Sequence, residues 1–200
     1  EMMKVAIVGR RNVGKSTLLN AILGQERVIV SETPGTTRDA IDTVFNYDGE
    51  SVLLIDTAGI RRSGKVEKGI EHYSALRALR AISRANITLL IIDAAEGLTA
   101  QDLHISGYIK DVFKGMVLVV NKWDLAEENG RDVSQFTSDI RRKLKFMPYV
   151  SILFTSAKFG SGMERILPTA REVYLGRAKR LPTPLVNRVI SEAVASHAPP

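Results

Sequence analysis

An eight-residue segment near the start of the chain, Gly9-Arg-Arg-Asn-Val-Gly14-Lys15-Ser16, restricts the fold more than any other feature. It follows the short apolar run 5–8 and precedes a helical pattern that begins at Lys15, so it joins a buried strand to a helix. Its glycines allow the backbone to curl until N–H groups face phosphate oxygens, and the following helix adds its positive end. The spacing is the G-x-x-x-x-G-K-[ST] pattern of a phosphate-binding P-loop, in the context that this pattern requires.

The side chains of the loop have separate expected roles. Lys15 is expected to neutralise the β- and γ-phosphates, and the Ser16 hydroxyl is expected to bind Mg²⁺. The residues predicted to contact the nucleotide here are Gly9, Asn12, Val13, Gly14, Lys15, Ser16 and Thr17.

Apolar strand-like runs alternate with helical patterns through the rest of the chain, which predicts an α/β fold of the P-loop NTPase class. Asp48-Gly49 joins two strand-like runs as a hairpin. We therefore expect a mostly parallel, six-stranded sheet with one antiparallel edge strand and helices on both faces. The loops at the carboxyl ends of the parallel strands then meet along one rim, where a ligand is expected to bind.

The segment Asp56-Thr-Ala-Gly59 follows a second buried run. An Asp at the carboxyl end of a strand beside the P-loop strand can hold Mg²⁺, and the N–H of Gly59 can approach the γ-phosphate. Alone, D-x-x-G is a weak signal, but it is strong at this distance after a P-loop.

Asn121-Lys122-Trp123-Asp124 closes the next-to-last core strand and matches the N-K-x-D pattern of guanine sites. The Asp124 carboxylate can accept both the ring N–H and the exocyclic amino group of guanine, a pair of donors that adenine lacks. The stem of Lys122 can cover one face of the base, and Asn121 is expected to brace the loop. Ser156-Ala157-Lys158, after the last strand, is expected to supply a backbone N–H near the base oxygen. Trp123 is predicted to pack within the loop.

The segment Thr33-Pro-Gly-Thr36-Thr37-Arg38-Asp39 lies between the first helix and the hairpin. A threonine here can bind Mg²⁺ and sense the γ-phosphate, so that the loop becomes ordered in the triphosphate state. In isolation the segment is a polar turn; with the other motifs present, the switch interpretation is favoured.

Composition excludes several other classes of protein. Apolar residues are 44% and charged residues 25%, the net charge is +6, and cysteines are absent, which removes disulfides and cysteine-based zinc sites. No apolar run approaches the roughly 20 residues of a membrane span, and the first residues lack a signal-peptide layout. We expect a cytoplasmic, monomeric domain without membrane contact.

These motifs are the five sequence elements of the translation-factor-related GTPases, in order. The stretches P-G-T-T-R-D, D-T-A-G-I-R-R and Tyr73-Ser-Ala-Leu-Arg-Ala-Leu-Arg-Ala-Ile-Ser-Arg-Ala resemble the Der (also called EngA) family of bacterial GTPases. That family carries two G domains in tandem and a C-terminal KH-like domain, and this chain resembles the second G domain. The resemblance implies a G domain over residues 1–178, and a linker with the truncated start of a KH-like domain over residues 179–200. Residues 185–196 read as a short helix, which either begins that domain or packs back on the first.

The resemblance also bears on catalysis. Ile60 stands where many GTPases have a water-orienting glutamine, and an isoleucine cannot hydrogen-bond water. In related GTPases a potassium ion, held by a P-loop asparagine and backbone carbonyls of the first switch, supplies positive charge instead. Asn12 matches that asparagine, with a loop-stabilising role as the alternative. By the same resemblance Thr37 is the favoured magnesium ligand and Thr36 the alternative. The expected catalytic set is Asn12, Lys15, Thr37 and Gly59.

The resemblance further implies a role in large-subunit ribosome biogenesis, with the ribosome or its RNA and other domains of the same chain as partners. Arg77, Arg80 and Arg84 fall on one face of a predicted helix, which is either a solvated face or a docking surface. Two other functions remain open: an ATP-using kinase or ATPase, which Asn121 to Asp124 oppose, and a nucleotide-holding module that hardly hydrolyses GTP.

Overall fold

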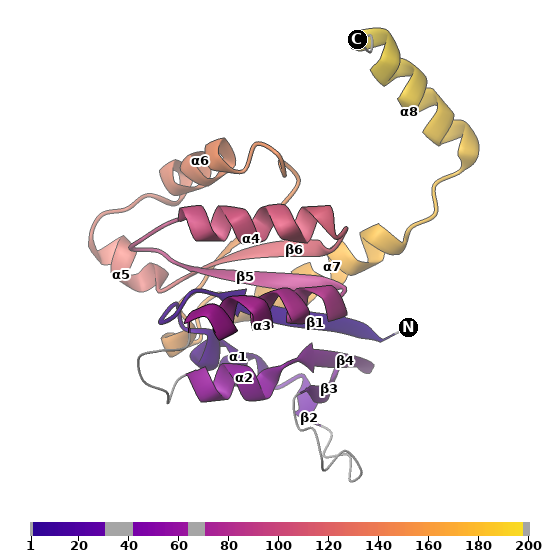
Figure 1. The fold of residues 1–200 in the computed structure, drawn as a ribbon. Helices are drawn as coiled ribbons and strands as arrows, with labels where there is room; N and C mark the ends of the chain where they lie inside the picture. The colour runs from indigo at the N-terminus through magenta and orange to yellow at the C-terminus, as the bar shows by residue number, and fades with distance from the viewer. Residues whose placement is uncertain (1, 31–41, 64–70, 198–200) are drawn as a thin grey trace.

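The computed structural model describes residues 2–30, 42–63 and 71–197, and Figure 1 shows a central sheet with helices on both faces. The strands are β1 (Met3–Gly9), β2 (Val28–Val30), β3 (Thr43–Tyr47), β4 (Glu50–Ile55), β5 (Ile87–Asp93), β6 (Gly115–Asn121) and β7 (Ser151–Phe154). The α-helices are α1 (Lys15–Leu23), α2 (Thr57–Ser63), α3 (Glu71–Arg84), α4 (Ala100–Asp111), α5 (Trp123–Glu128), α6 (Val133–Lys143), α7 (Ile166–Ala178) and α8 (Thr183–Ser196). Two 3-10 turns, η1 (Ala157–Phe159) and η2 (Met163–Arg165), follow β7.

The seven strands lie in the order β2-β3-β4-β1-β5-β6-β7. β1 is parallel to both of its neighbours, β4 and β5, and β6 and β7 continue the parallel part. β3 is antiparallel to β4 and to β2. The predicted α/β class, with a mostly parallel sheet and helices on both faces, is confirmed.

The predicted number of six strands is wrong by one, because β2 pairs beyond the hairpin and becomes the edge of the sheet. β2 has only three residues and none of them is buried, so it leaves no alternating pattern in the sequence. The predicted hairpin is present, and both turn residues, Asp48 (φ 53°) and Gly49 (φ 86°), have the positive φ angles that a tight two-residue connection requires.

The central strands are buried on both faces, which explains why they read as continuous apolar runs. Successive side chains of a strand point to opposite faces, so β5 sends Leu89 and Ile91 into one core and Leu90 and Ile92 into the other. α1 and α7 cover the first core, and α3, α4, α5 and α6 cover the second. The sheet is therefore fixed from both sides, and the loops at its carboxyl-end rim extend from a rigid base.

α8 stands apart from the rest of the chain in Figure 1. It buries none of its residues, and the apolar side chains of Val189, Ile190 and Val194 are each about half exposed. Of the two arrangements that the sequence left open for this helix, the structure does not have the one in which it packs back on the first domain. The boundary at residue 178 stays a prediction; it coincides with the end of α7.

No helix within the described ranges has both the length and the apolar character that crossing a lipid bilayer demands.

Candidate nucleotide-binding site

The predicted motifs meet on one rim of the sheet because the parallel strands that precede them all end there. The P-loop follows β1, Asp56 follows β4, the Lys122 to Asp124 segment follows β6, and Ser156 to Lys158 follow β7. Segments more than 140 residues apart in the chain thus come to share one site. Thr33, Thr36 and Thr37 lie outside the described residues, so the predicted first-switch ligands stay a prediction.

The backbone of the P-loop requires its two glycines. Gly9 has φ 156° and lies against the carbonyl of Ile91, while Gly14 has φ 99° and lies against the side-chain amide of Asn121. A β-carbon at either position would overlap those atoms. Gly14 also caps the N-terminus of α1, whose first residues are Lys15, Ser16 and Thr17, so the positive end of the helix opens into the curl of the loop.

The ammonium group of Lys15 turns back onto its own loop. It donates hydrogen bonds to the carbonyls of Gly9 (2.7 Å) and Arg10 (2.5 Å). Burial, and secondly the positive charge of Arg11, lower the pKa of Lys15 to about 8. A phosphate group in the loop would place a negative charge beside this ammonium.

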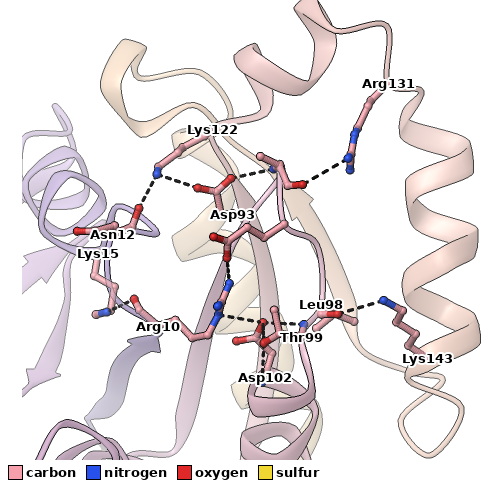
Figure 2. A network of polar contacts seen from close by, with 12 residues as sticks. Arg10, Asn12, Lys15, Asp93, Leu98, Thr99, Asp102, Lys122, Arg131 and Lys143 are labelled. Carbon is pink, nitrogen blue, oxygen red and sulfur yellow. Dashed lines mark hydrogen bonds and ion pairs between the residues drawn. The ribbon is translucent and has the colours of Figure 1, made fainter. Parts of the chain in front are cut away.

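Arg10 anchors the P-loop on the other side, as Figure 2 shows. Its guanidinium pairs with Glu96 and lies 3.8 Å from a carboxylate oxygen of Asp102, which is 1% exposed. Asp102 in turn forms a capping box with Thr99 at the start of α4. The loop is thus tied to the β5–α4 connection by a residue that the sequence motif leaves unspecified.

Asn121 is buried and joins the base-recognition loop to the P-loop. Its amide nitrogen donates to the carbonyl of Val13 (2.9 Å), and its amide oxygen accepts from the hydroxyl of Thr155 (3.2 Å) and the N–H of Ala157 (3.0 Å). These hydrogen bonds join three segments of the rim: the P-loop, the segment after β6 that carries Asn121, and the segment after β7.

Lys122 makes a second connection between the same loops. Its ammonium donates to the carbonyl of Asn12 and to the carboxylate of Asp93 (2.8 Å), as drawn in Figure 2. Asp93 was not predicted as a site residue. It is the last residue of β5 and lies opposite Asn121 in the strand register, so its position on the rim follows from the pairing of β5 with β6.

The carboxylate of Asp124 is oriented by Ser156. The serine hydroxyl donates to Asp124 Oδ1 (2.8 Å) and accepts from the Asp124 N–H (3.0 Å). Asp124 itself is partly exposed. Lys158 is exposed, with its ammonium 5.3 Å from the centre of the Phe159 ring.

Trp123 was predicted to pack within its own loop, but it packs into the second core. Its ring is 8% exposed and meets Phe154 and Phe136 edge-on, with centroid distances of 4.7 and 5.5 Å. The aromatic contacts fix the first turn of α5 and thereby the position of the neighbouring Lys122 and Asp124.

The two described candidates for binding magnesium contact different helices: Ser16 contacts α2 and Asp56 contacts α3. The hydroxyl of Ser16 donates to the carbonyl of Ile60 (2.8 Å), and the carboxylate of Asp56 accepts a two-pronged pair from Arg77. That hydrogen bond raises the pKa of Arg77 further. A hydroxyl and a carboxylate are hard oxygen ligands of the kind that Mg²⁺ takes alongside phosphate and water, so the donor set fits this metal.

The basic face predicted on α3 is divided between different partners. Arg77 pairs with Asp56, Arg84 pairs with Asp42, and Arg80 is exposed. Asp42 also accepts the N–H of Asp56 (2.8 Å), so this end of α3 is connected to the carboxyl end of β4. Only part of the stripe is therefore the solvated face that one interpretation of the sequence expected.

Comparison with known proteins agrees with this geometry. A family model described as "50S ribosome-binding GTPase" matches residues 4–122, which include the P-loop, Asp56 and the start of N-K-x-D. The chain belongs to this family. As a member of it, the chain is a GTPase domain.

Two relatives of the GTPase domain show how far the likeness extends. It is 51% identical over 197 residues to GTPase Der of Chloroflexus aggregans and 52% identical over 200 residues to GTPase Der of Caldanaerobacter subterraneus subsp. tengcongensis. These alignments cover 98% and 100% of the chain but 44% and 46% of the relatives. The chain thus spans less than half the length of the curated relatives that it matches.

Among solved structures, the GTPase domain is similar to Era in complex with MgGDPNP and nucleotides 1506–1542 of 16S ribosomal RNA. The TM-score is 0.62 at 30% sequence identity, covering 86% of this chain and 57% of that one.

Replacing Asn121 by alanine should weaken the domain even without nucleotide, because the Val13 carbonyl and the Ala157 N–H would be left buried and unpaired. We expect the free energy of unfolding to fall by about 2–4 kcal/mol in urea titrations. The matched control is Asn129→Ala, which removes one exposed side-chain hydrogen bond at the end of α5 and should cost less than about 1 kcal/mol. Equal losses for the two variants would contradict the bracing role.

Proposed function

We propose that this domain binds guanine nucleotides with Mg²⁺, hydrolyses GTP slowly, and acts as a switch in the maturation of the large ribosomal subunit. The observation that carries the proposal is the pair of links from the N-K-x-D segment to the P-loop, Asn121 to Val13 and Lys122 to Asn12. They hold a base-recognition carboxylate and a phosphate-binding loop in one fixed relation. A nucleotide can then contact both at once.

In this proposal the β- and γ-phosphates lie in the curl of the P-loop. The ammonium of Lys15 leaves the carbonyls of Gly9 and Arg10 and pairs with the phosphates, where its charge is compensated. The N–H of Gly59, which donates to the carbonyl of Asp56 (3.0 Å) in this structure, turns to the γ-phosphate. Asp124 accepts the two N–H donors of guanine, with Ser156 holding the carboxylate and Lys122 covering the base.

Ser16, Asp56 and Thr37 would hold Mg²⁺. When bound, the ion neutralises charge on the β- and γ-phosphate oxygens. The residues of the chain orient the triphosphate and exclude bulk water, and a water held by backbone groups attacks the γ-phosphorus. The bond from that phosphorus to the bridging oxygen breaks, which gives GDP and phosphate.

Slow turnover is expected from the residue after Gly59. Ile60 is 6% exposed and belongs to the first core, so its side chain faces away from water and cannot orient a nucleophile. We propose that K⁺, held by Asn12 and by carbonyls of the first switch, supplies part of the missing positive charge. Asn12 is exposed at the mouth of the loop.

The role in ribosome assembly is supported by the family, whose description names the 50S subunit, and by the Era complex, which contains ribosomal RNA. A net charge of +6 suits an RNA-rich partner. We propose that the domain acts within a longer chain, with α8 leading into a KH-like domain, and that the protein is a cytoplasmic monomer.

The identity of the base can be tested by Asp124→Asn. Asparagine presents one acceptor and one donor, which suit xanthine and leave a guanine donor unpaired, so GDP affinity should fall by roughly a thousandfold or more while xanthosine diphosphate binds. Fluorescence competition with both nucleotides measures this. The charge-matched control is Glu127→Gln, an exposed position on the same helix, which should leave GDP binding unchanged. Unaltered preference for guanine in the Asp124 variant would refute the assigned role.

The cation mechanism predicts that GTP hydrolysis is faster in KCl than in NaCl at equal ionic strength, by about tenfold or more. The same comparison with Asn12→Ala should show little difference between the salts while GTP still binds. Phosphate release under single-turnover conditions is the measurement. Equal rates in both salts for the unaltered chain would exclude a catalytic role for potassium. They would favour a switch that hydrolyses GTP only in the presence of another domain or the ribosome.

The ribosomal role predicts that the full-length protein sediments with large subunits when loaded with a non-hydrolysable GTP analogue, and much less with GDP. Binding should weaken by at least about tenfold between 50 and 200 mM salt, because phosphate contacts release counterions. Small subunits serve as the control. Binding that is independent of the nucleotide, or equal for the two subunits, would contradict a nucleotide-dependent switch on the large subunit.

A further inference from the structure

Arg77 connects α3 to the nucleotide-facing rim through a two-pronged contact. Its Nη2 donates to Asp56 Oδ1 (2.6 Å), and its Nε donates to Oδ2 of the same carboxylate. Both oxygens of Asp56 are therefore engaged by one planar guanidinium, the geometry in which an arginine–carboxylate pair is strongest. Asp56 is 13% exposed in this pair, whereas Arg77 is 42% exposed, so the arginine reaches inward from the surface to the carboxylate.

The same guanidinium also lies on Gly59. A β-carbon built at Gly59 would be 2.5 Å from Cζ and Nε of Arg77. Gly59 is the residue whose N–H is proposed to face the γ-phosphate. Gly9, Lys15, Asp56, Gly59 and Arg77 line one small hollow, so the arginine stands inside the space to which phosphate and metal are assigned.

The other described magnesium candidate is engaged in a parallel way. The hydroxyl of Ser16 donates to the carbonyl of Ile60, one residue beyond Gly59. Ser16 thus contacts a carbonyl of α2, and Asp56 contacts a cation of α3. Each contact uses the oxygen that a metal ion would need.

Charge decides whether arginine and metal can share this position. Mg²⁺ and a guanidinium are both cations, and Asp56 offers a single negative charge whose two oxygens are already paired. Bringing a divalent ion into contact with that carboxylate while Arg77 remains would bring like charges within a few ångströms of each other in a partly buried site.

We propose that Arg77 is a built-in substitute for magnesium: it holds the metal-binding carboxylate of Asp56 while the ion is absent, and binding of Mg²⁺ displaces it and releases α3. This inference rests on the proposed function, since it takes Asp56 as a magnesium ligand. Two consequences follow. The metal-free domain is stabilised by the pair, and the apparent affinity for Mg²⁺ is lowered by the cost of breaking it.

The test compares Arg77→Gln with Arg80→Gln. Both variants remove one positive charge from α3, but Arg80 is exposed and one turn away from the pair. The chain is loaded with a fluorescent GDP analogue, and nucleotide dissociation is followed while free Mg²⁺ is titrated. We expect the half-saturating Mg²⁺ concentration to fall by about threefold to tenfold in Arg77→Gln and to stay unchanged in Arg80→Gln.

Thermal unfolding in EDTA without nucleotide supplies the second readout. Arg77→Gln should unfold at a lower temperature than Arg80→Gln, and the difference should disappear when Mg²⁺ and GDP saturate the chain, because the pair is already broken in that state. A difference that persists in the loaded state would mean that Arg77 is a fixed structural partner of Asp56 and would overturn the proposal.

Two further outcomes separate this inference from the proposed function. If Arg77→Gln needs as much Mg²⁺ as the unaltered chain, or more, the substitution of arginine for metal is refuted while GDP binding stands. If the unaltered chain fails to bind GDP at all, the proposed function fails first, and the inference fails with it.

Discussion

One buried amide fixes the relation between the two halves of the site. Asn121 is 2% exposed and satisfies a carbonyl of the P-loop, a hydroxyl and an N–H of the segment after β7. These groups come from two segments that lie far apart in sequence, and each is buried too deeply to be left without a partner. The relation between the P-loop and the N-K-x-D segment is consequently set by the interior of the protein rather than by a bound ligand.

The rim is otherwise organised by charges that face one another across loops. Lys122 joins Asp93 and the P-loop, Arg10 joins the P-loop to α4, and Arg77 joins α3 to the end of β4. Each of these cations comes from one segment and each anion from another. Such pairs contribute little individually where they are exposed, but together they hold the loops in register around the hollow.

Much of this arrangement could be predicted from the sequence, for identifiable reasons. The P-loop, the hairpin at Asp48-Gly49 and the buried strands have local signatures: required glycines, positive φ angles and apolar runs. β2 was not predicted because its three residues, none of them buried, show no alternation of apolar and polar side chains. The contacts of Arg10, Asp93 and Arg77 were not predicted because they depend on partners 21 to 92 positions away, which only the folded chain brings close. Asp93 could have been found from its register opposite Asn121.

The way α3 is seated also determines what kind of motion the helix can make. Its second half is fixed, because Ala81 and Ile82 are buried in the second core and Arg84 is paired with Asp42. Arg77 lies on the half nearer the nucleotide rim, where the neighbouring Ala75 and Leu76 are exposed. A helix held in this manner cannot slide along its axis without moving Ala81 and Ile82 out of the core. The loss of one contact at Asp56 therefore leaves the second half of α3 held by the core, and its effect is confined to the half that carries Arg77.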